Sequence, residues 1–189
     1  MDKIIHLSVF LHTPPDKAFD MFTNSHLLES WLTVLAEVEP VIGGKFELFW
    51  EPEDKANNST LGCKITAIEK NKFLSFEWHS PKQFKHFANT SDPLTHVVVF
   101  FIPKASNTEV HLIHSGWQSS SEWEEARIWQ EKAWKLAFNT LVKHFDNNTN
   151  GSWLENDPAD TKRQKIINGD LFIRIRLCCQ SQIRKPVRR

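Results

Sequence analysis

The stretch SEWEEARIWQEKAWKLAFNTLVKHF, residues 121–145, decides the fold. Apolar side chains recur in it at three- and four-residue intervals, the period of an α-helix with one buried side. They are Trp123, Ala126, Ile128, Trp129, Ala133, Trp134, Ala137, Phe138, Leu141, Val142 and Phe145. Ser121, with Glu124 three residues later, predicts a capping box at the start of this helix. Its broad aromatic stripe suits a long helix laid across a curved sheet.

The residues before this helix predict a meander of about six strands. The apolar side chains there alternate with polar ones, or form short runs bounded by turn residues. The extended stretches are VEPVIGGKFELFW (38–50), LGCKITAIE (61–69), FLSFEWH (73–79), THVVVFFIP (95–103) and EVHLIHSGW (109–117). Gly43 and Gly44 divide the first stretch, where a hairpin turn needs a positive φ.

The N-terminal part predicts one strand and two short helices. Residues 4–11, IIHLSVFL, alternate as a strand with one apolar face. Thr13, followed by two prolines, predicts a helix N-cap, and a second short helix restarts after Asn24. The order strand, two helices, meander and long helix is typical of an α+β fold. We expect one domain over residues 1–146, followed by a polar, basic tail over residues 147–189 that is largely disordered or loosely attached.

The composition is typical of a globular protein except in its aromatic residues. Among 189 residues, 40% are hydrophobic and 24% charged, but eight Trp and fourteen Phe stand beside no Tyr. The N-terminus lacks the apolar segment of a signal peptide, and no apolar run is long enough to span a membrane. The three Cys form neither a disulfide framework nor a metal-ligand pattern. We therefore expect a cytoplasmic protein with reduced thiols and no membrane span.

Charge is distributed unevenly along the chain. Residues 1–146 hold 14 Lys and Arg against 19 Asp and Glu, whereas residues 147–189 hold 9 against 4. The acidic main part argues against nucleic acid as a partner, because phosphate binding needs a clustered basic surface. The basic tail has three interpretations that stay open: a solvated extension, a segment that binds an anionic surface or a protein, and an added edge strand formed by LFIRIRLCC, residues 171–179.

Several motifs carry a resemblance to a known family. They are HTPPDKAFDMFT (12–23), LLESWL (27–32), VIGGKFELFW (41–50), LGCKITAIEKNKFLSFEW (61–78), VHLIHSGW (110–117) and KAWKLAFNTLVKHF (132–145). In this order the chain resembles the homologues of the activator of the 90-kDa heat-shock-protein ATPase. That family belongs to the START-like, birch-pollen-allergen-like (SRPBCC) superfamily. The resemblance implies a helix-grip fold, in which a sheet wraps around the C-terminal helix and leaves a cavity used by many superfamily members for apolar molecules.

The residues themselves point to an aromatic site between sheet and helix. Phe46, Leu48 and Trp50 share one face of a predicted strand, and Leu74, Phe76 and Trp78 share one face of another. Rings with few polar groups among them suit an apolar ligand, although a filled core of touching rings is an open alternative. The predicted ligand-binding residues are Trp31, Phe46, Leu48, Trp50, Phe76, Trp78, Phe100, His114, Trp117, Trp134 and Phe138.

The histidines predict no metal site and no catalytic group. His111 and His114 lie three apart on a predicted strand, so their side chains leave opposite faces and cannot share a metal ion. His114 is interpreted either as a polar group that orients a ligand or acts as a base, or as a structural histidine. No phosphate-binding loop or nucleophile motif occurs, and no cofactor is expected.

Three functions remain, in the order that the sequence favours them. The first is a protein that binds a small apolar molecule, lipid-like or aromatic, in an internal cavity. The alternative is a co-chaperone-like module that contacts a chaperone ATPase through its outer face, for which a protein partner is expected. The third, a cyclase or hydratase, needs an ionisable group inside the cavity.

Overall fold

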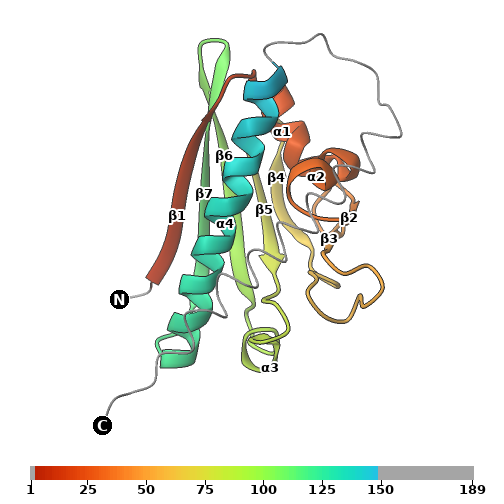
Figure 1. Cartoon of the computed structure of the whole chain (residues 1–189), viewed down its shortest axis with the longest axis vertical. Helices are drawn as coiled ribbons and strands as arrows, with labels where there is room; N and C mark the ends of the chain where they lie inside the picture. The colour runs from red at the N-terminus through yellow and green to blue at the C-terminus, as the bar shows by residue number, and fades with distance from the viewer. Residues whose placement is uncertain (1–2, 149–189) are drawn as a thin grey trace.

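A computed structural model describes residues 3–148 and shows a curved antiparallel sheet with one long helix across it (Figure 1). Residues 149–189 lie outside the described residues, and with them most of the predicted tail, including the possible strand at 171–179. The elements run in the order β1 (Lys3–Leu11), α1 (Pro15–Thr23), α2 (Ser25–Trp31), β2 (Leu35–Val38), β3 (Phe46–Phe49), β4 (Ile65–Glu69), β5 (Phe73–Trp78), α3 (Lys85–Ala88), β6 (Thr95–Lys104), β7 (Asn107–Trp117) and α4 (Ser121–Asn148).

The strands form two sheets, where the sequence predicted one sheet of about six. Five strands make the main sheet in the order β1-β7-β6-β5-β4, and β2 and β3 pair separately. The second pair stays attached to the main sheet, because the Phe46 amide donates to the Cys63 carbonyl and the Ile65 amide to the Gly44 carbonyl. The ladder between the two sheets is limited to isolated bridges, so the strands diverge there.

Two helix starts differ by one residue from the prediction. The N-cap of α1 is Pro14 and not Thr13, which is buried and whose carbonyl accepts a bond from Thr108 Oγ1 at 2.8 Å. At α4 the backbone amides of Trp123 and Glu124 bond to Ser120, so Ser120 and not Ser121 closes the first turn. Both differences are within the uncertainty of a cap position read from sequence.

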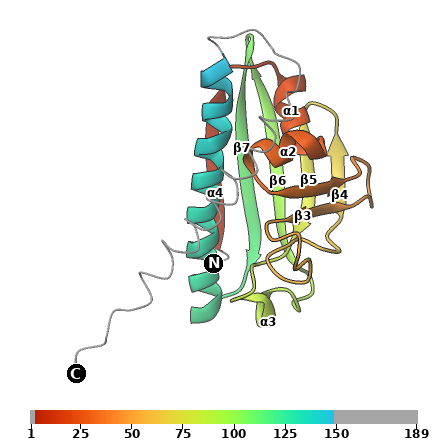
Figure 2. The same cartoon turned by 45° about the vertical axis from the view of Figure 1, so that its right-hand side comes forward.

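The interior lies between the concave face of the sheet and the helices. Helices α1, α2 and α4 are all on one side of the five-stranded sheet (Figures 1 and 2). On β6 and β7 every second side chain is buried, which places Val97, Val99, Leu112 and His114 inside. Burying a large apolar side chain such as Val99 or Leu112 stabilises the fold by about 1.5–3 kcal/mol.

The long helix closes this interior. Helix α4 buries a stripe that includes Ala126, Gln130, Trp134 and Phe138 against the sheet. It ends at Asn148, two residues beyond the predicted domain end. Among the described residues, no helix is both long and apolar enough to cross a membrane.

Candidate ligand site between the sheet and α4

Ten of the eleven predicted ligand-binding residues lie in the interior. Nine of them are at most 4% exposed: Trp31, Phe46, Leu48, Phe76, Trp78, His114, Trp117, Trp134 and Phe138. Trp50 is partly buried and packs against the same core. The structure thus brings together side chains from α2, β3, β5, β7 and α4, as the face-sharing pattern of the strands predicted.

The prediction was wrong for Phe100, which lies on the outer face of the sheet. It is 38% exposed and pairs with Phe73 and His111 across its neighbouring strands. Its neighbour Phe101 points inward, is 2% exposed and contacts Phe19 and Phe22, each with ring centroids 5.3 Å apart. The sequence held the signal for this, because side chains alternate between the two faces of a strand. Residue 101 therefore shares the inner face with Val97 and Val99.

The interior rings form one connected cluster. Phe46 stacks on Phe76 with centroids 3.8 Å apart. Trp78 lies 4.8 Å from Trp134, and Trp134 lies 6.3 Å from Phe138. Such edge-to-face and tilted pairs add stability beyond the burial of the rings themselves. We call the aromatic cluster the connected rings of Trp31, Phe46, Trp50, Phe76, Trp78, His114, Trp117, Trp134 and Phe138.

Most buried indole groups in this cluster have a hydrogen-bond acceptor. Three of them donate to backbone carbonyls: Trp31 to Met21 at 2.9 Å, Trp50 to Leu32 at 2.7 Å and Trp117 to His114 at 3.1 Å. Two donate to side chains, since Trp78 bonds to Gln130 Oε1 and Trp134 to His114 Nδ1, both at 3.2 Å. The hydrogen bonds of the site are therefore made mainly by tryptophan N–H donors.

His114 is the central polar residue of the site. It is fully buried on β7, opposite Ile5 and Val97 of the neighbouring strands. Burial lowers the pKa of His114 well below its usual value, and the charge of His96 lowers it further, so the ring is neutral at pH 7. Its Nε2 atom has no hydrogen-bond partner in the part of the chain that the structure describes.

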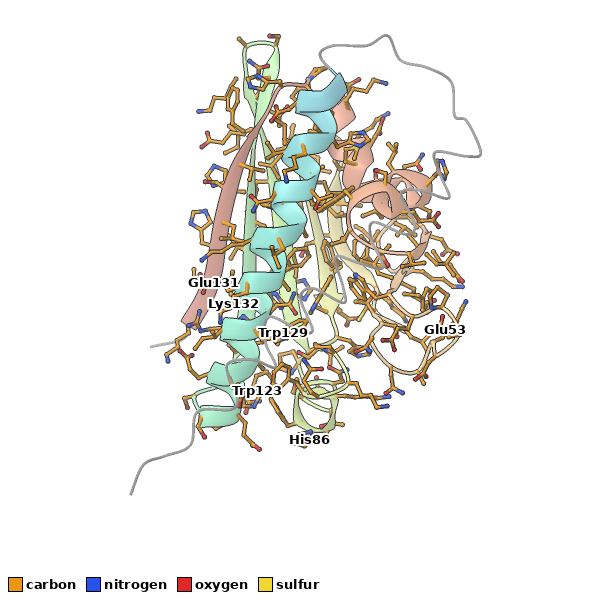
Figure 3. All side chains as sticks on the ribbon, viewed as in Figure 1. Glu53, His86, Trp123, Trp129, Glu131 and Lys132 are labelled. Atoms are coloured by element: carbon orange, nitrogen blue, oxygen red, sulfur yellow. The ribbon has the colours of Figure 1, made fainter. Side chains whose placement is uncertain are left out.

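Trp129 carries a second unpartnered polar atom. Its Nε1 is buried and, within residues 3–148, has no acceptor. Figure 3 shows Trp129 and Trp123 extending from the side of α4 that faces α3. The ring centroids of Trp129 and Phe84 are 6.1 Å apart. Those of Trp123 and Trp117, which lies beside His114, are 6.3 Å apart. Trp129 therefore borders the aromatic cluster at the α3 end.

Two site residues were missed at the level of sequence. Trp129 was placed only in the helical stripe, and Gln130 was not considered. Gln130 is 4% exposed and supplies the acceptor for Trp78. The available signal was its position, since a polar residue four after Ala126 and four before Trp134 lies within the buried stripe.

The described interior has little that can carry charge. No group of three or more His, Cys, Asp and Glu in residues 3–148 is arranged to hold a metal ion. Cys63 is a buried free thiol, and burial raises its pKa, so it stays protonated. The buried residues of the described part include Glu47 but no Lys or Arg.

Comparison with known proteins gives a family match and a set of similar folds. Residues 12–146 match the profile of the family described as Activator of Hsp90 ATPase homolog 1-like protein, which covers more than half of the chain. A search of curated proteins gave no match.

Solved structures confirm the α+β helix-grip fold that the sequence predicted. Protein MLL2253 from Mesorhizobium loti aligns with a TM-score of 0.61 and 22% identity, over 77% of this chain and 98% of its own. The Aha1 dimer from Colwellia psychrerythraea aligns with a TM-score of 0.57 and 15% sequence identity, over 76% of this chain and 96% of its own. A protein described as an HSP90 activator from Plasmodium falciparum aligns with a TM-score of 0.50 and 24% sequence identity, over 77% of this chain and 91% of its own. At these identities the likeness concerns the fold alone.

Proposed function

The chain belongs to the family of Activator of Hsp90 ATPase homolog 1-like proteins, and we propose that it binds one small, largely apolar molecule between the five-stranded sheet and α4. The observation that carries this proposal is the unpartnered Nε2 atom of His114, fully buried inside the aromatic cluster. We also propose that the protein acts in the cytoplasm, where its free thiol Cys63 would stay reduced.

The cost of the unpartnered atom is the argument for a ligand. A buried donor or acceptor without a partner costs about 1–3 kcal/mol, which is a large part of a protein's net stability. The buried indole of Trp129, beside Phe84 at the α3 end of the core, carries a second such cost. Buried polar groups in native proteins are nearly always satisfied by protein, water or ligand. A bound molecule that accepts a hydrogen bond from His114 would remove its penalty while its apolar part contacts the rings.

Titration with N-phenyl-1-naphthylamine, an uncharged apolar fluorophore, tests this proposal. We expect a saturable fluorescence increase with one molecule per chain, and the corresponding 1:1 mass in native mass spectrometry. The failure of both methods to detect a complex would contradict ligand binding.

A pair of variants locates the site. Ala137 is 3% exposed on the buried side of α4, so Ala137→Phe places a ring where the ligand would lie. We expect it to fold and to bind the fluorophore at least about tenfold more weakly. Phe100→Ala, on the outer face, is the control and should bind as the wild type does. If the interior is already filled, Ala137→Phe instead loses about 1–3 kcal/mol of stability through overpacking.

A second candidate function is contact with a chaperone ATPase through the outer face of the sheet. The family description names an activator of the Hsp90 ATPase, and the Plasmodium falciparum protein is described as an HSP90 activator. The observation on this chain that favours it is an outer apolar patch of Phe10, Phe100 and Ile102, each at least 38% exposed. Phe10 and Ile102 both pair with Glu109, so they flank it on neighbouring strands. Exposed apolar patches mark interaction surfaces.

The ATPase rate of a purified 90-kDa heat-shock protein tests this second candidate. Added wild-type protein should raise the rate, and the double variant Phe10→Ser with Phe100→Ser should lose the effect while keeping fluorophore binding. An unchanged rate with the wild-type protein, or full stimulation by the double variant, would exclude the outer apolar patch as the contact.

A further inference from the structure

We propose that the molecule bound in this interior is uncharged and presents a hydrogen-bond acceptor, such as a carbonyl oxygen, to the Nε2–H group of His114. This inference rests on the proposed ligand-binding function and names the chemical class of the ligand. It follows from which atoms of the site donate, which accept and which carry charge.

The bond from Trp134 determines which nitrogen of His114 carries the proton. An indole nitrogen can only donate, so the Trp134 Nε1 contact at 3.2 Å requires a lone pair on His114 Nδ1. In a neutral imidazole the proton then sits on Nε2. The unpartnered atom is therefore a donor, and only a hydrogen-bond acceptor can satisfy it.

The side-chain acceptors beside His114 are already engaged. Of the other two unpartnered buried atoms in residues 3–148, Trp129 Nε1 is a donor, whereas Asn71 Oδ1, in the turn between β4 and β5, is an acceptor. The side-chain acceptors Gln130 Oε1 and His114 Nδ1 each already receive an indole N–H. Five buried threonine hydroxyl groups also make hydrogen bonds, in which each donates to the backbone carbonyl of another residue. They belong to Thr23, Thr33, Thr60, Thr95 and Thr108. A ligand that brings an acceptor therefore complements the free donor of His114.

The absence of a buried cation in residues 3–148 favours an uncharged ligand. A carboxylate moved from water into an apolar interior needs a positive partner to offset its desolvation. No Lys or Arg is among the buried side chains of the described part. His114 is not a cation at pH 7, since its ring is neutral there. A ketone, quinone, ester or ether meets the acceptor requirement without this penalty.

Three naphthalene derivatives of similar shape test the inference by isothermal titration calorimetry. 2-Acetylnaphthalene carries a carbonyl, 2-isopropenylnaphthalene carries a methylene group in the same place, and 2-naphthoate carries a negative charge. We expect the ketone to bind about tenfold more tightly than the alkene, the fold-change that one net hydrogen bond produces. The carboxylate should bind more weakly than either.

Two measurements assign the effect to His114. His114→Phe keeps a flat ring but removes the donor, so the ratio between ketone and alkene should fall to about one, whereas Phe100→Ala should keep the wild-type ratio. Nitrogen-15 NMR of the unmodified protein should show the Nε2–H tautomer of His114 and a shift of that proton when the ketone is added. This second measurement does not depend on whether the variant folds.

The outcomes separate the two proposals. Equal binding of ketone and alkene, tighter binding of the carboxylate, or an Nδ1–H tautomer would overturn the acceptor inference and leave ligand binding in place. If neither neutral probe binds, the proposed function itself fails. A ketone preference that persists in His114→Phe would also overturn the assignment to His114.

Discussion

His114 and the tryptophans around it show how single residues define the interior. The ring of His114 lies 4.6 Å from that of Trp117, accepts a bond from Trp134 and has no charge at pH 7. In the same region the indole N–H of Trp78 donates a hydrogen bond to Gln130 Oε1. Each indole N–H in this set depends on one particular acceptor, because a buried donor that loses its partner is costly in a low-dielectric interior.

The bond between Trp78 and Gln130 should be measurable as a coupling energy. Gln130→Leu leaves the buried indole N–H without an acceptor, so we expect it to lower the free energy of unfolding by about 1–3 kcal/mol. Adding Trp78→Phe should cost less in this background than in the wild type, because the orphaned donor is then gone. Urea denaturation of both single variants and the double variant gives the coupling. Additive losses would mean that the bond contributes nothing.

Two neighbouring phenylalanines test which side of β6 is inside. Phe101 is buried against Phe19 and Phe22, so Phe101→Ala should lower the free energy of unfolding by about 3–5 kcal/mol. Phe100 is on the outer face, and Phe100→Ala should cost less than about 1 kcal/mol. Chemical denaturation of the two variants side by side checks this order, and a reversed order would show that the strand has the opposite orientation.

At the scale of elements, the turn before β3 directs the second pair of strands. Gly43 adopts φ 80°, and its amide donates to Ile65, while Gly44 lies against the backbone of Glu39. The two glycines thus serve different purposes, since one allows a left-handed backbone conformation and the other allows close approach of two chain segments. Together they hold β2 and β3 beside the start of β4.

Alanine substitutions separate these two purposes. At Gly43 a Cβ atom meets nothing within 4 Å, so Gly43→Ala should cost only the left-handed conformation, about 1–2 kcal/mol. At Gly44 the added carbon would collide with the Glu39 carbonyl oxygen and Cβ, so the turn must move and Gly44→Ala should cost more. Thermal unfolding followed by circular dichroism compares them. Equal losses would show that the turn relaxes freely.

For the whole molecule, one buried and three partly buried histidines link stability to pH. Burial is the main cause that lowers the pKa of these side chains. They are His114 on β7, His96 on β6, His79 directly after β5 and His144 on α4. In the unfolded chain the same side chains titrate near pH 6.5. Below that pH the unfolded state binds more protons than the folded state, so acid favours unfolding.

We therefore expect the free energy of unfolding to fall as the pH is lowered from 7.5 to 5. Each histidine that stays neutral in the fold contributes a slope of at most about 1.4 kcal/mol per pH unit below its unfolded pKa. Urea denaturation at several pH values gives the slope, and His114→Phe should make it shallower. Constant stability across this range, or a variant with the wild-type slope, would contradict the burial of a neutral His114.

The sequence by itself determined the fold class and most of the interior. The 3.6-residue period of α4 and the alternation of β3, β5 and β7 are local signals, because each depends on a side chain's position relative to its own backbone. They were sufficient to place ten of the eleven predicted site residues inside, and the motifs along residues 4–145 were sufficient for the family.

Only the tertiary structure decided how these elements meet. It separated β2 and β3 from the main sheet, turned Phe101 rather than Phe100 inward, and joined Gln130 to Trp78 and Trp134 to His114. The partners in each of these bonds are 20 or more residues apart in sequence. Strand register and hydrogen-bond pairing arise from the packing of distant segments, so no local pattern can encode which donor in the core finds an acceptor and which does not.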